Sequence, residues 1–242
     1  MSRRILVFSL FAVALAALFT RLGFWQISRM HERQALNAYI ASRMDSTPVP
    51  FFALSGDSAV THFRRVTLSG TPDFAHEVYI TEVSRSGSPG VYVITPVRVA
   101  GHDTAVLVNR GWVYAPDAST IEPDRWHAPD SVFDGYVDEF QHPLPVLREP
   151  HHLRTINYAQ ISAQLPYPIA DTYVVALGKD SVISGVPLRI DPPPLDEGPF
   201  RSYAIQWFAF ALISIGGATF VALKDREARR AAARQESPNA GA

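Results

Sequence analysis

The sequence predicts a membrane protein of the α+β class, in which two transmembrane helices flank an outward-facing, antiparallel, β-rich domain with a barrel-like or sandwich-like shape. Two uncharged apolar runs, one near each end of the chain, predict the helices. Between them lie short runs of alternating apolar and polar residues, separated by turn residues, which predict the sheet. The formal net charge of -1 over 242 residues argues against a nucleic-acid partner, because phosphate binding requires a basic surface.

The first apolar run covers residues 5–20 and extends past Arg21 to Trp25. A helix over residues 5–25 is about 31 Å long, which is enough to cross the hydrocarbon core of a bilayer. A cleaved signal peptide is the alternative, because MSRR is a suitable basic start and the alanines around Ala14 resemble a cleavage site. The apolar run continues beyond those alanines, which favours the transmembrane helix.

The second apolar run, residues 203–223, contains no charged residue and predicts a second transmembrane helix. Basic residues mark the cytoplasmic ends of membrane helices. Arg3 and Arg4 precede the first run, and four basic residues follow the second: Lys224, Arg226, Arg229 and Arg230. Residues 1–4 and a frayed basic tail, residues 224–242, are therefore predicted in the cytoplasm of a bacterial-type inner membrane, with residues 26–202 on the periplasmic or extracellular side.

The outer domain is predicted to begin with a helical extension and to continue as a sheet. Apolar residues recur at helical spacing up to residue 44, and Pro48 and Pro50 then mark a linker. A short helix is predicted in residues 155–165, capped by Thr155 or Asn157. Residues 191–199, DPPPLDEGP, predict an extended entry into the second span. Six alternating runs predict strands: residues 64–70, 76–83, 90–99, 103–115, 131–140 and 172–178.

Catalytic and metal-binding motifs are absent from the sequence. The chain has no cysteine, which excludes disulfides, a CxxCH haem attachment and a thiol nucleophile. His151 and His152 are adjacent, and neighbours on a strand point to opposite faces, while no HxxxH or HExxH spacing is present. Because the GxSxG elbow and the phosphate-binding loop are also missing, the sequence predicts neither an enzyme nor a metal site.

Polar and aromatic side chains gather at the predicted outer ends of both spans. On each helix they recur at spacings of three and four residues, so that they share one face. The polar and aromatic faces of the two helices are expected to pack against each other. The candidate cofactor-binding residues are Trp25, Gln26, Arg29, Tyr203, Gln206 and Trp207.

Two interpretations of these residues remain open. In the first, the aromatic residues anchor the helices at the membrane interface, and Gln26 and Gln206 join the helices by a hydrogen bond. In the second, the faces form a crevice rimmed by Arg29, Arg33 and Arg201. Such a crevice suits a flat amphipathic ligand such as a haem, whose propionates bind guanidinium groups while its ring stacks on aromatic faces.

Three blocks of the sequence resemble the Surfeit locus protein 1 family in the same order and at similar separations. They are LGFWQISRMHER, the pair GVYVITPVRV and AVLVNRGWV, and SYAIQWFAF, and the stretch RVTLSGTPDFAHEVYI is similar to the family segment before the central block. The positions that carry the resemblance are Gly23, Trp25, Gln26, Arg29, Gly90, Thr95, Pro96, Asn109, Arg110, Gly111, Trp112, Tyr203, Ala204 and Trp207.

The family consists of two-span membrane proteins with an outward-facing domain that assist assembly of haem-copper cytochrome c oxidase and are implicated in delivering haem a to its catalytic subunit. The resemblance implies an assembly factor or chaperone of respiratory-chain biogenesis, with haem a bound transiently. The implied partners are oxidase subunit I, proteins of haem a synthesis or delivery, and the lipid bilayer. The alternatives are a haem-independent membrane scaffold that stabilises an oxidase subunit, and a membrane-anchored hydrolase.

One departure from the family affects the haem hypothesis. Many members carry a histidine three residues before the tyrosine of the second span, which has been regarded as a candidate iron ligand, whereas this chain has Phe200. Phenylalanine cannot bind iron. Three alternatives follow. A haem is held without an iron ligand from this helix, or its iron is bound by another residue, or no haem is bound. For the second alternative, His31 is a weak substitute.

Two further sets of residues have expected roles. In VNRGW, Gly111 is expected to need a positive φ or a close contact, and Arg110 belongs either to a structural turn or to a surface facing the membrane and a partner subunit. Gly216 and Gly217 are expected to contact the oxidase subunit, because small residues permit close helix approach.

Overall fold

The chain folds into two compact units, which we call the helical unit and the β domain. The computed structural model describes residues 3–54, 58–128, 131–141, 151–178 and 185–236. The helical unit comprises Met1–Tyr39 and Leu195–Ala242, and the β domain comprises Ile40–Pro194. The predicted boundaries at residues 25, 202 and 223 divide the membrane-spanning segments from the outer domain and the cytoplasmic tail. They stay a prediction.

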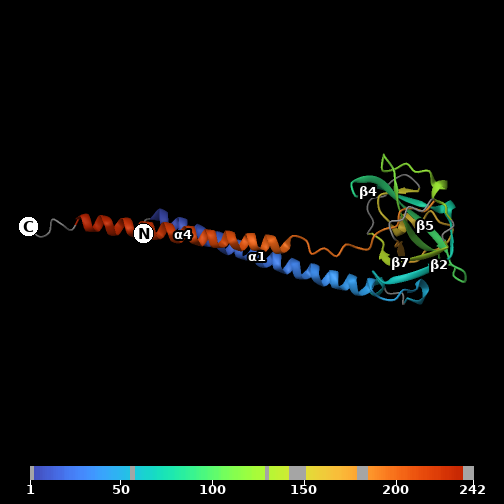
Figure 1. The fold of residues 1–242 in the computed structure, drawn as a ribbon, viewed down its shortest axis with the longest axis horizontal. Coiled ribbons are helices and arrows are strands. Elements are labelled where there is room, and N and C mark those ends of the chain that lie inside the picture. Colours follow the sequence, from blue (N-terminus) through green and yellow to red (C-terminus); the bar gives the residue numbers. More distant parts are fainter. Residues whose placement is uncertain (1–2, 55–57, 129–130, 142–150, 179–184, 237–242) are drawn as a thin grey trace, which may run out of the picture. The chain divides into compact units, whose positions relative to one another are not determined.

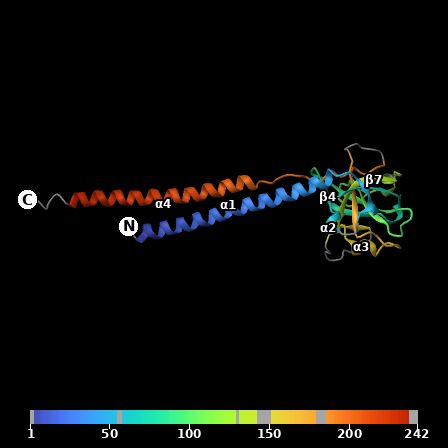
Figure 2. The ribbon, with the colours of Figure 1, turned by 90° about the horizontal axis from the view of Figure 1, so that it is seen from below.

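Two long helices, α1 (Arg3–Met44) and α4 (Phe200–Glu236), dominate the helical unit and lie side by side in both views (Figures 1 and 2). Both are long and apolar enough to be candidate membrane spans, which confirms the two predicted apolar helices. The predicted helical continuation beyond residue 25 is confirmed, because α1 is unbroken to Met44.

The predicted fraying of the tail is wrong up to residue 236, because α4 continues and contains the ion pair between Arg229 and Asp225. Residues 1–2 and 237–242 lie outside the described residues.

Small residues form the contact between α1 and α4. Ala12 and Ala16 of α1 are buried, and Gly23 of α1 lies so close to Phe208 of α4 that a Cβ there would be 2.7 Å from its ring. Small side chains permit this approach, which maximises van der Waals contact between helices. Seven-residue spacing keeps the α4 contacts on one seam. The buried seam residues of α4 are Ala204, Ala211 and Ala218.

All six predicted strands are present in the β domain. They are β2 (Arg65–Ser69), β4 (Val78–Arg85), β5 (Ser88–Arg98), β6 (Val106–Tyr114), β7 (Val132–Glu139) and β9 (Thr172–Ala176). Sequence reasoning missed three two-residue strands, which are too short to show alternation. They are β1 (Val49–Pro50), β3 (Thr71–Pro72) and β8 (His152–Leu153).

The strands form one mixed sheet in the order β1-β2-β7-β9-β6-β5-β4-β8, with β3 paired to β5. The prediction of a wholly antiparallel sheet is wrong, because β1–β2, β4–β8 and β6–β9 are parallel pairs. The sheet is also not a closed barrel, since its order begins at β1 and ends at β8. The β6–β9 pair is parallel because β9 lies between β6 and β7 in the sheet, instead of being added at an edge.

Short helices occupy the connections between strands. They are α2 (Ser58–Thr61), α3 (Tyr158–Ser162), η1 (Phe51–Ala53), η2 (Phe74–His76) and η3 (Pro123–Trp126). The predicted cap of α3 is Asn157, whose side chain accepts a hydrogen bond from the backbone N–H of Gln160 at 3.1 Å. Asn157 is therefore the correct one of the two predicted caps.

The two faces of the central strands pack into different core clusters. Leu107 and Val175 belong to one cluster with Ile94, whereas the adjacent Val108 and Val174 belong to another. Neighbouring residues of a strand point to opposite faces, so β6 and β9 bury both faces. This explains why their sequences read as nearly continuous apolar runs.

A β-bulge interrupts the pairing of β5 with β6. Val93 pairs with Gly111, and Ile94 pairs with Asn109, so that Arg110 is the extra residue. Gly111 has a φ of +137°, and a Cβ at this position would lie 2.3 Å from the carbonyl oxygen of Leu188. The expected need for glycine at residue 111 is confirmed, and the sequence VNRGW is a bulged strand instead of a turn.

We expect Gly111→Ala to destabilise the β domain strongly. A side chain at this φ costs about 1–3 kcal/mol, and the contact with Leu188 adds steric repulsion. The matched control is Gly87→Ala, because Gly87 has a φ of +81° but no atom within 4 Å of the position of its Cβ. Near-ultraviolet circular dichroism during unfolding in detergent micelles measures both effects. Equal losses in the two variants would contradict the role of the Leu188 contact.

Candidate functional site

The six predicted binding residues all lie in the helical unit, but they have different environments. Trp207 packs between the helices, where its ring stacks on Phe19 of α1 with centroids 5.7 Å apart. Phe210 meets the edge of the same ring at 6.0 Å. Trp25 and Tyr203 are 54% and 46% exposed. The structure therefore places Trp207 in the helix contact and leaves the other two aromatic side chains largely accessible.

The predicted hydrogen bond between Gln26 and Gln206 is not formed. The side-chain oxygen of Gln26 is buried without a hydrogen-bond partner, whereas Gln206 is exposed. The close packing of Gly23 on Phe208 already joins the helices here. The prediction of a glutamine clamp is therefore wrong, and steric complementarity takes its place.

A cavity of about 360 Å³ lies beside residues 29–36 of α1, at the start of α4. Arg29 and Arg33 line it, as the predicted crevice requires, and so does Phe200. Arg29 is the only one of the six predicted binding residues in its lining. The remaining lining residues are Glu32, Leu36, Asp196 and Gly198.

The arginines of this cavity are already paired with carboxylates. Arg29 forms an ion pair with Glu32. Arg33 donates from Nε to the backbone oxygen of Asp196 at 3.0 Å, and its terminal nitrogen is 3.4 Å from the Asp196 carboxylate. Asn37 donates to the same backbone oxygen at 2.9 Å. These bonds tie α1 to the segment before α4.

This arrangement does not fit a haem. Its propionates would compete with the carboxylates of Glu32 and Asp196 for the two guanidinium groups, and the lining contains no imidazole to bind iron. Phe200 occupies the position at which the resemblance implies a histidine, and His31 is exposed and outside the lining. The cavity is therefore a polar clamp between two segments of the helical unit.

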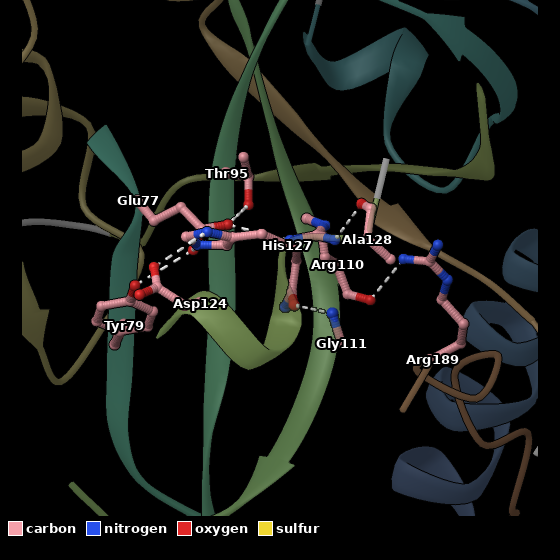
Figure 3. A network of polar contacts seen from close by, with 10 residues as sticks. Glu77, Tyr79, Thr95, Arg110, Gly111, Asp124, His127, Ala128 and Arg189 are labelled. Carbon is pink, nitrogen blue, oxygen red and sulfur yellow. Dashed lines mark hydrogen bonds and ion pairs between the residues drawn. The ribbon is translucent and has the colours of Figure 1, made fainter. Parts of the chain in front are cut away.

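A second cluster of polar residues is buried in the β domain (Figure 3). Glu77 is 3% exposed and Arg110 is fully buried, and Arg110 donates to Oε1 of Glu77 at 3.1 Å. The hydroxyl of Thr95 donates to the same oxygen. The bulge in β6 directs the Arg110 side chain toward β4 and β5, because an extra residue changes the alternation of the strand.

The network reaches loops from other parts of the chain. Tyr79 donates to Oε2 of Glu77 at 3.2 Å, and Nε2 of His127, just after η3, lies 3.1 Å from that oxygen. Arg110 also donates to the backbone oxygen of Ala128 at 3.3 Å, and Arg189 donates to the backbone oxygen of Arg110 at 2.7 Å. The network thus joins three strands to the η3 loop and to the segment after β9.

Burial explains the electrostatics of this cluster. Burial, and then the neighbouring Glu77 carboxylate, raise the pKa of the Tyr79 phenol above its ordinary value, so Tyr79 remains a hydrogen-bond donor. Each carboxylate oxygen of Glu77 contacts two partners. The cluster has the character of a structural ion pair instead of a catalytic centre.

The position of Arg110 corrects one prediction and shows what sequence reasoning missed. The surface-facing role of Arg110 is wrong, because its guanidinium is paired with Glu77 inside the domain. Sequence reasoning places Glu77 only in a strand and misses its role, because an acidic residue is rarely buried unless it is paired and its partner is distant in the chain. Pairing of β4, β5 and β6 brings Glu77, Thr95 and Arg110 together.

Comparison with known proteins gives consistent similarities. A model of the SURF1 family matches residues 13–212. A SURF1-like protein of Mycobacterium tuberculosis is 29% identical over 88% of this chain and 80% of its own length. A SURF1-like protein of Rickettsia felis is 27% identical over 79% and 86%. Surfeit locus protein 1 of Takifugu rubripes is 28% identical over 52% and 55%.

We expect Arg110→Met to lower the free energy of unfolding of the β domain by about 3–5 kcal/mol, because it leaves the Glu77 carboxylate buried without its cation. Arg125→Met is the matched control, since Arg125 forms a largely exposed ion pair with Glu122 and such pairs contribute little. Chemical denaturation in detergent, followed by near-ultraviolet circular dichroism, measures both variants. A similar small loss in the two would show that the buried pair is dispensable.

Proposed function

The chain belongs to the SURF1 family, and from this premise we propose that it is an assembly factor for a haem-copper cytochrome c oxidase. The observation that carries the proposal is the family match over residues 13–212, which includes the β domain, most of the first candidate span and the start of the second. Oxidase subunit I and proteins of haem a synthesis or delivery are the proposed partners. The proposed location is a bacterial-type cytoplasmic membrane, with both termini in the cytoplasm and the β domain outside.

Delivery or insertion of haem a into the catalytic subunit is the narrower role that the family resemblance implies. The paired state of Arg29 and Arg33, together with Phe200, supports the alternative of a scaffold that contacts an oxidase subunit without carrying haem in this cavity. We therefore propose that the helical unit assists assembly through protein contact. This role requires no catalytic step.

The face of α4 that carries Gly216 and Gly217 is suited to such a contact. Gly216 and Gly217 are exposed, and no atom lies within 4 Å of the position that a Cβ would occupy at either residue. The neighbouring Leu212 and Ile213 are 74% and 69% exposed. Paired glycines allow another helix to approach the α4 backbone closely, and the apolar neighbours are compatible with a membrane environment.

We expect the double substitution Gly216→Leu, Gly217→Leu to reduce the amount of oxidase subunit I that co-purifies with the protein and to lower oxidase activity in membranes. Leucine keeps α4 apolar but prevents close approach of a partner helix. The matched control is Gly216→Ala, Gly217→Ala, which adds little bulk and should retain most of the capture. Unchanged capture by the leucine variant, at equal protein levels, would contradict this docking face.

Haem analysis of the full-length protein separates the two versions of the proposal. In cells that make haem a, we expect the detergent-purified protein to contain subunit I but less than stoichiometric haem by absorption spectroscopy and pigment extraction. Stoichiometric haem a that is lost in Trp207→Ala would instead support a haem site at the helix contact. If the purified protein contained no haem and no oxidase subunit, this result would contradict the assembly function itself.

A further inference from the structure

The β domain contains a second and larger pocket, of about 500 Å³, which is separate from the Glu77–Arg110 network. The curled sheet brings side chains of β5 and β7 to one place, although β6 and β9 separate these strands in the sheet. The pocket lies within the range of about 300–1,000 Å³ that is typical of small-molecule sites. Its lining consists of His62, Phe63, Arg85, Tyr92, Tyr136, Asp138, Ile190, Asp191, Pro192, Pro193 and Pro194.

Two phenol groups in this pocket have unused hydrogen-bonding capacity. The hydroxyls of Tyr92 and Tyr136 make no hydrogen bond with any residue in the described part of the chain, although Tyr136 is only 7% exposed. Burial raises the pKa of both phenols, and the Asp138 carboxylate raises that of Tyr136 further. Both groups therefore keep their protons at neutral pH and are donors without a protein acceptor.

The carboxylate of Asp138 does not serve as that acceptor, because other donors occupy it. His62 Nε2 lies 3.0 Å from Oδ1, the backbone N–H of Glu139 donates to the same oxygen at 2.9 Å, and Tyr173 donates to Oδ2 at 2.9 Å. Burial acts to raise the pKa of Asp138, but these hydrogen bonds outweigh it and hold the pKa below its ordinary value. Asp138 is therefore ionised, and both of its oxygens already have partners among His62, Glu139 and Tyr173.

Flat apolar groups form the walls of the pocket. The rings of His62 and Phe63 stack with centroids 3.7 Å apart. Arg85 donates to the backbone oxygen of Arg189 at 2.7 Å and to the Asp191 carboxylate at 2.8 Å. These bonds hold the segment that continues into the three prolines at residues 192–194. Arg85 thus fixes a wall and is already paired with an anion.

We propose that this pocket binds a small, uncharged, planar ligand that carries a carbonyl oxygen at its rim. The carbonyl oxygen accepts hydrogen bonds from the phenols of Tyr92 and Tyr136, and the ring lies between the aromatic and proline walls. An anionic ligand is disfavoured, because the lining contains the carboxylates of Asp138 and Asp191 against the single guanidinium of Arg85. This site is independent of the proposed role in oxidase assembly.

The test uses 4-fluoroacetophenone as the probe and full-length protein in lipid nanodiscs. Fluorine nuclear magnetic resonance measures its dissociation constant, with 4-fluoroethylbenzene and 4-fluorobenzoate as analogues that lack the acceptor or add a charge. We expect the ketone to bind more tightly than either analogue. Partitioning into lipid is common to all protein variants, so it does not affect their comparison.

Removal of each hydroxyl tests the assigned donors. We expect Tyr92→Phe and Tyr136→Phe each to weaken ketone binding about 3- to 10-fold, which is the effect of losing one neutral hydrogen bond. Tyr114→Phe is the matched control, because Tyr114 is 59% exposed on β6 and outside the pocket, and it should leave binding unchanged. Tyr92 is less buried than Tyr136, so its variant remains informative if Tyr136→Phe does not fold.

Three results would overturn the proposal. The first is tighter binding of 4-fluorobenzoate than of the ketone, and the second is equal binding of 4-fluoroethylbenzene. The third is a ketone affinity that is the same in wild type, Tyr92→Phe and Tyr114→Phe. Loss of oxidase assembly with intact ketone binding, or the reverse, would separate this site from the function of the helical unit.

Discussion

Glu77 and Arg110 are buried together in the β domain, and two buried charges are stable only when hydrogen bonds satisfy both groups. This constraint determines much of the surrounding structure. The bulge in β6 aims Arg110 at Glu77, and the η3 loop supplies His127 and the carbonyl of Ala128. Thr95 and Tyr79 complete the shell of the carboxylate. Thr95 and Arg110, two of the residues that carry the family resemblance, therefore belong to the network of a buried ion pair.

The helical unit depends on a different physical effect. Apolar burial gives little net attraction between helices in lipid, so close packing and local polar bonds have to hold them together. Gly23 and the alanine seam of α4 provide close packing, while Arg33 and Asn37 bind the backbone of Asp196 at one end. The same bonds occupy the guanidinium group that a haem propionate would need. The face of α4 that carries Gly216 and Gly217 has no such contacts within the described residues.

The two pockets described above differ in whether their polar groups are already satisfied. In the helical unit, Arg29 and Arg33 line the cavity but are paired with Glu32 and Asp196. In the β domain, Asp138 and Arg85 are paired, whereas the phenols of Tyr92 and Tyr136 are not. An unpaired donor in a buried site gains more from a ligand than a donor that must first give up a partner. The β domain therefore contains the pocket with more unused binding capacity.

The sequence by itself determined the two apolar helices, the six main strands and the need for glycine at residue 111, because each depends on local periodicity or on one residue's backbone. For the cap of α3 it left Thr155 and Asn157 open, and the structure decided for Asn157. Tertiary structure decided the parallel pairing of β9 with β6, the buried ion pair of Arg110 with Glu77, and the placement of Tyr92 and Tyr136 in the lining of one pocket. It also decided that Gln26 and Gln206 do not bond. These features join residues far apart in the chain, and strand order and helix rotation leave no periodic signal in the sequence.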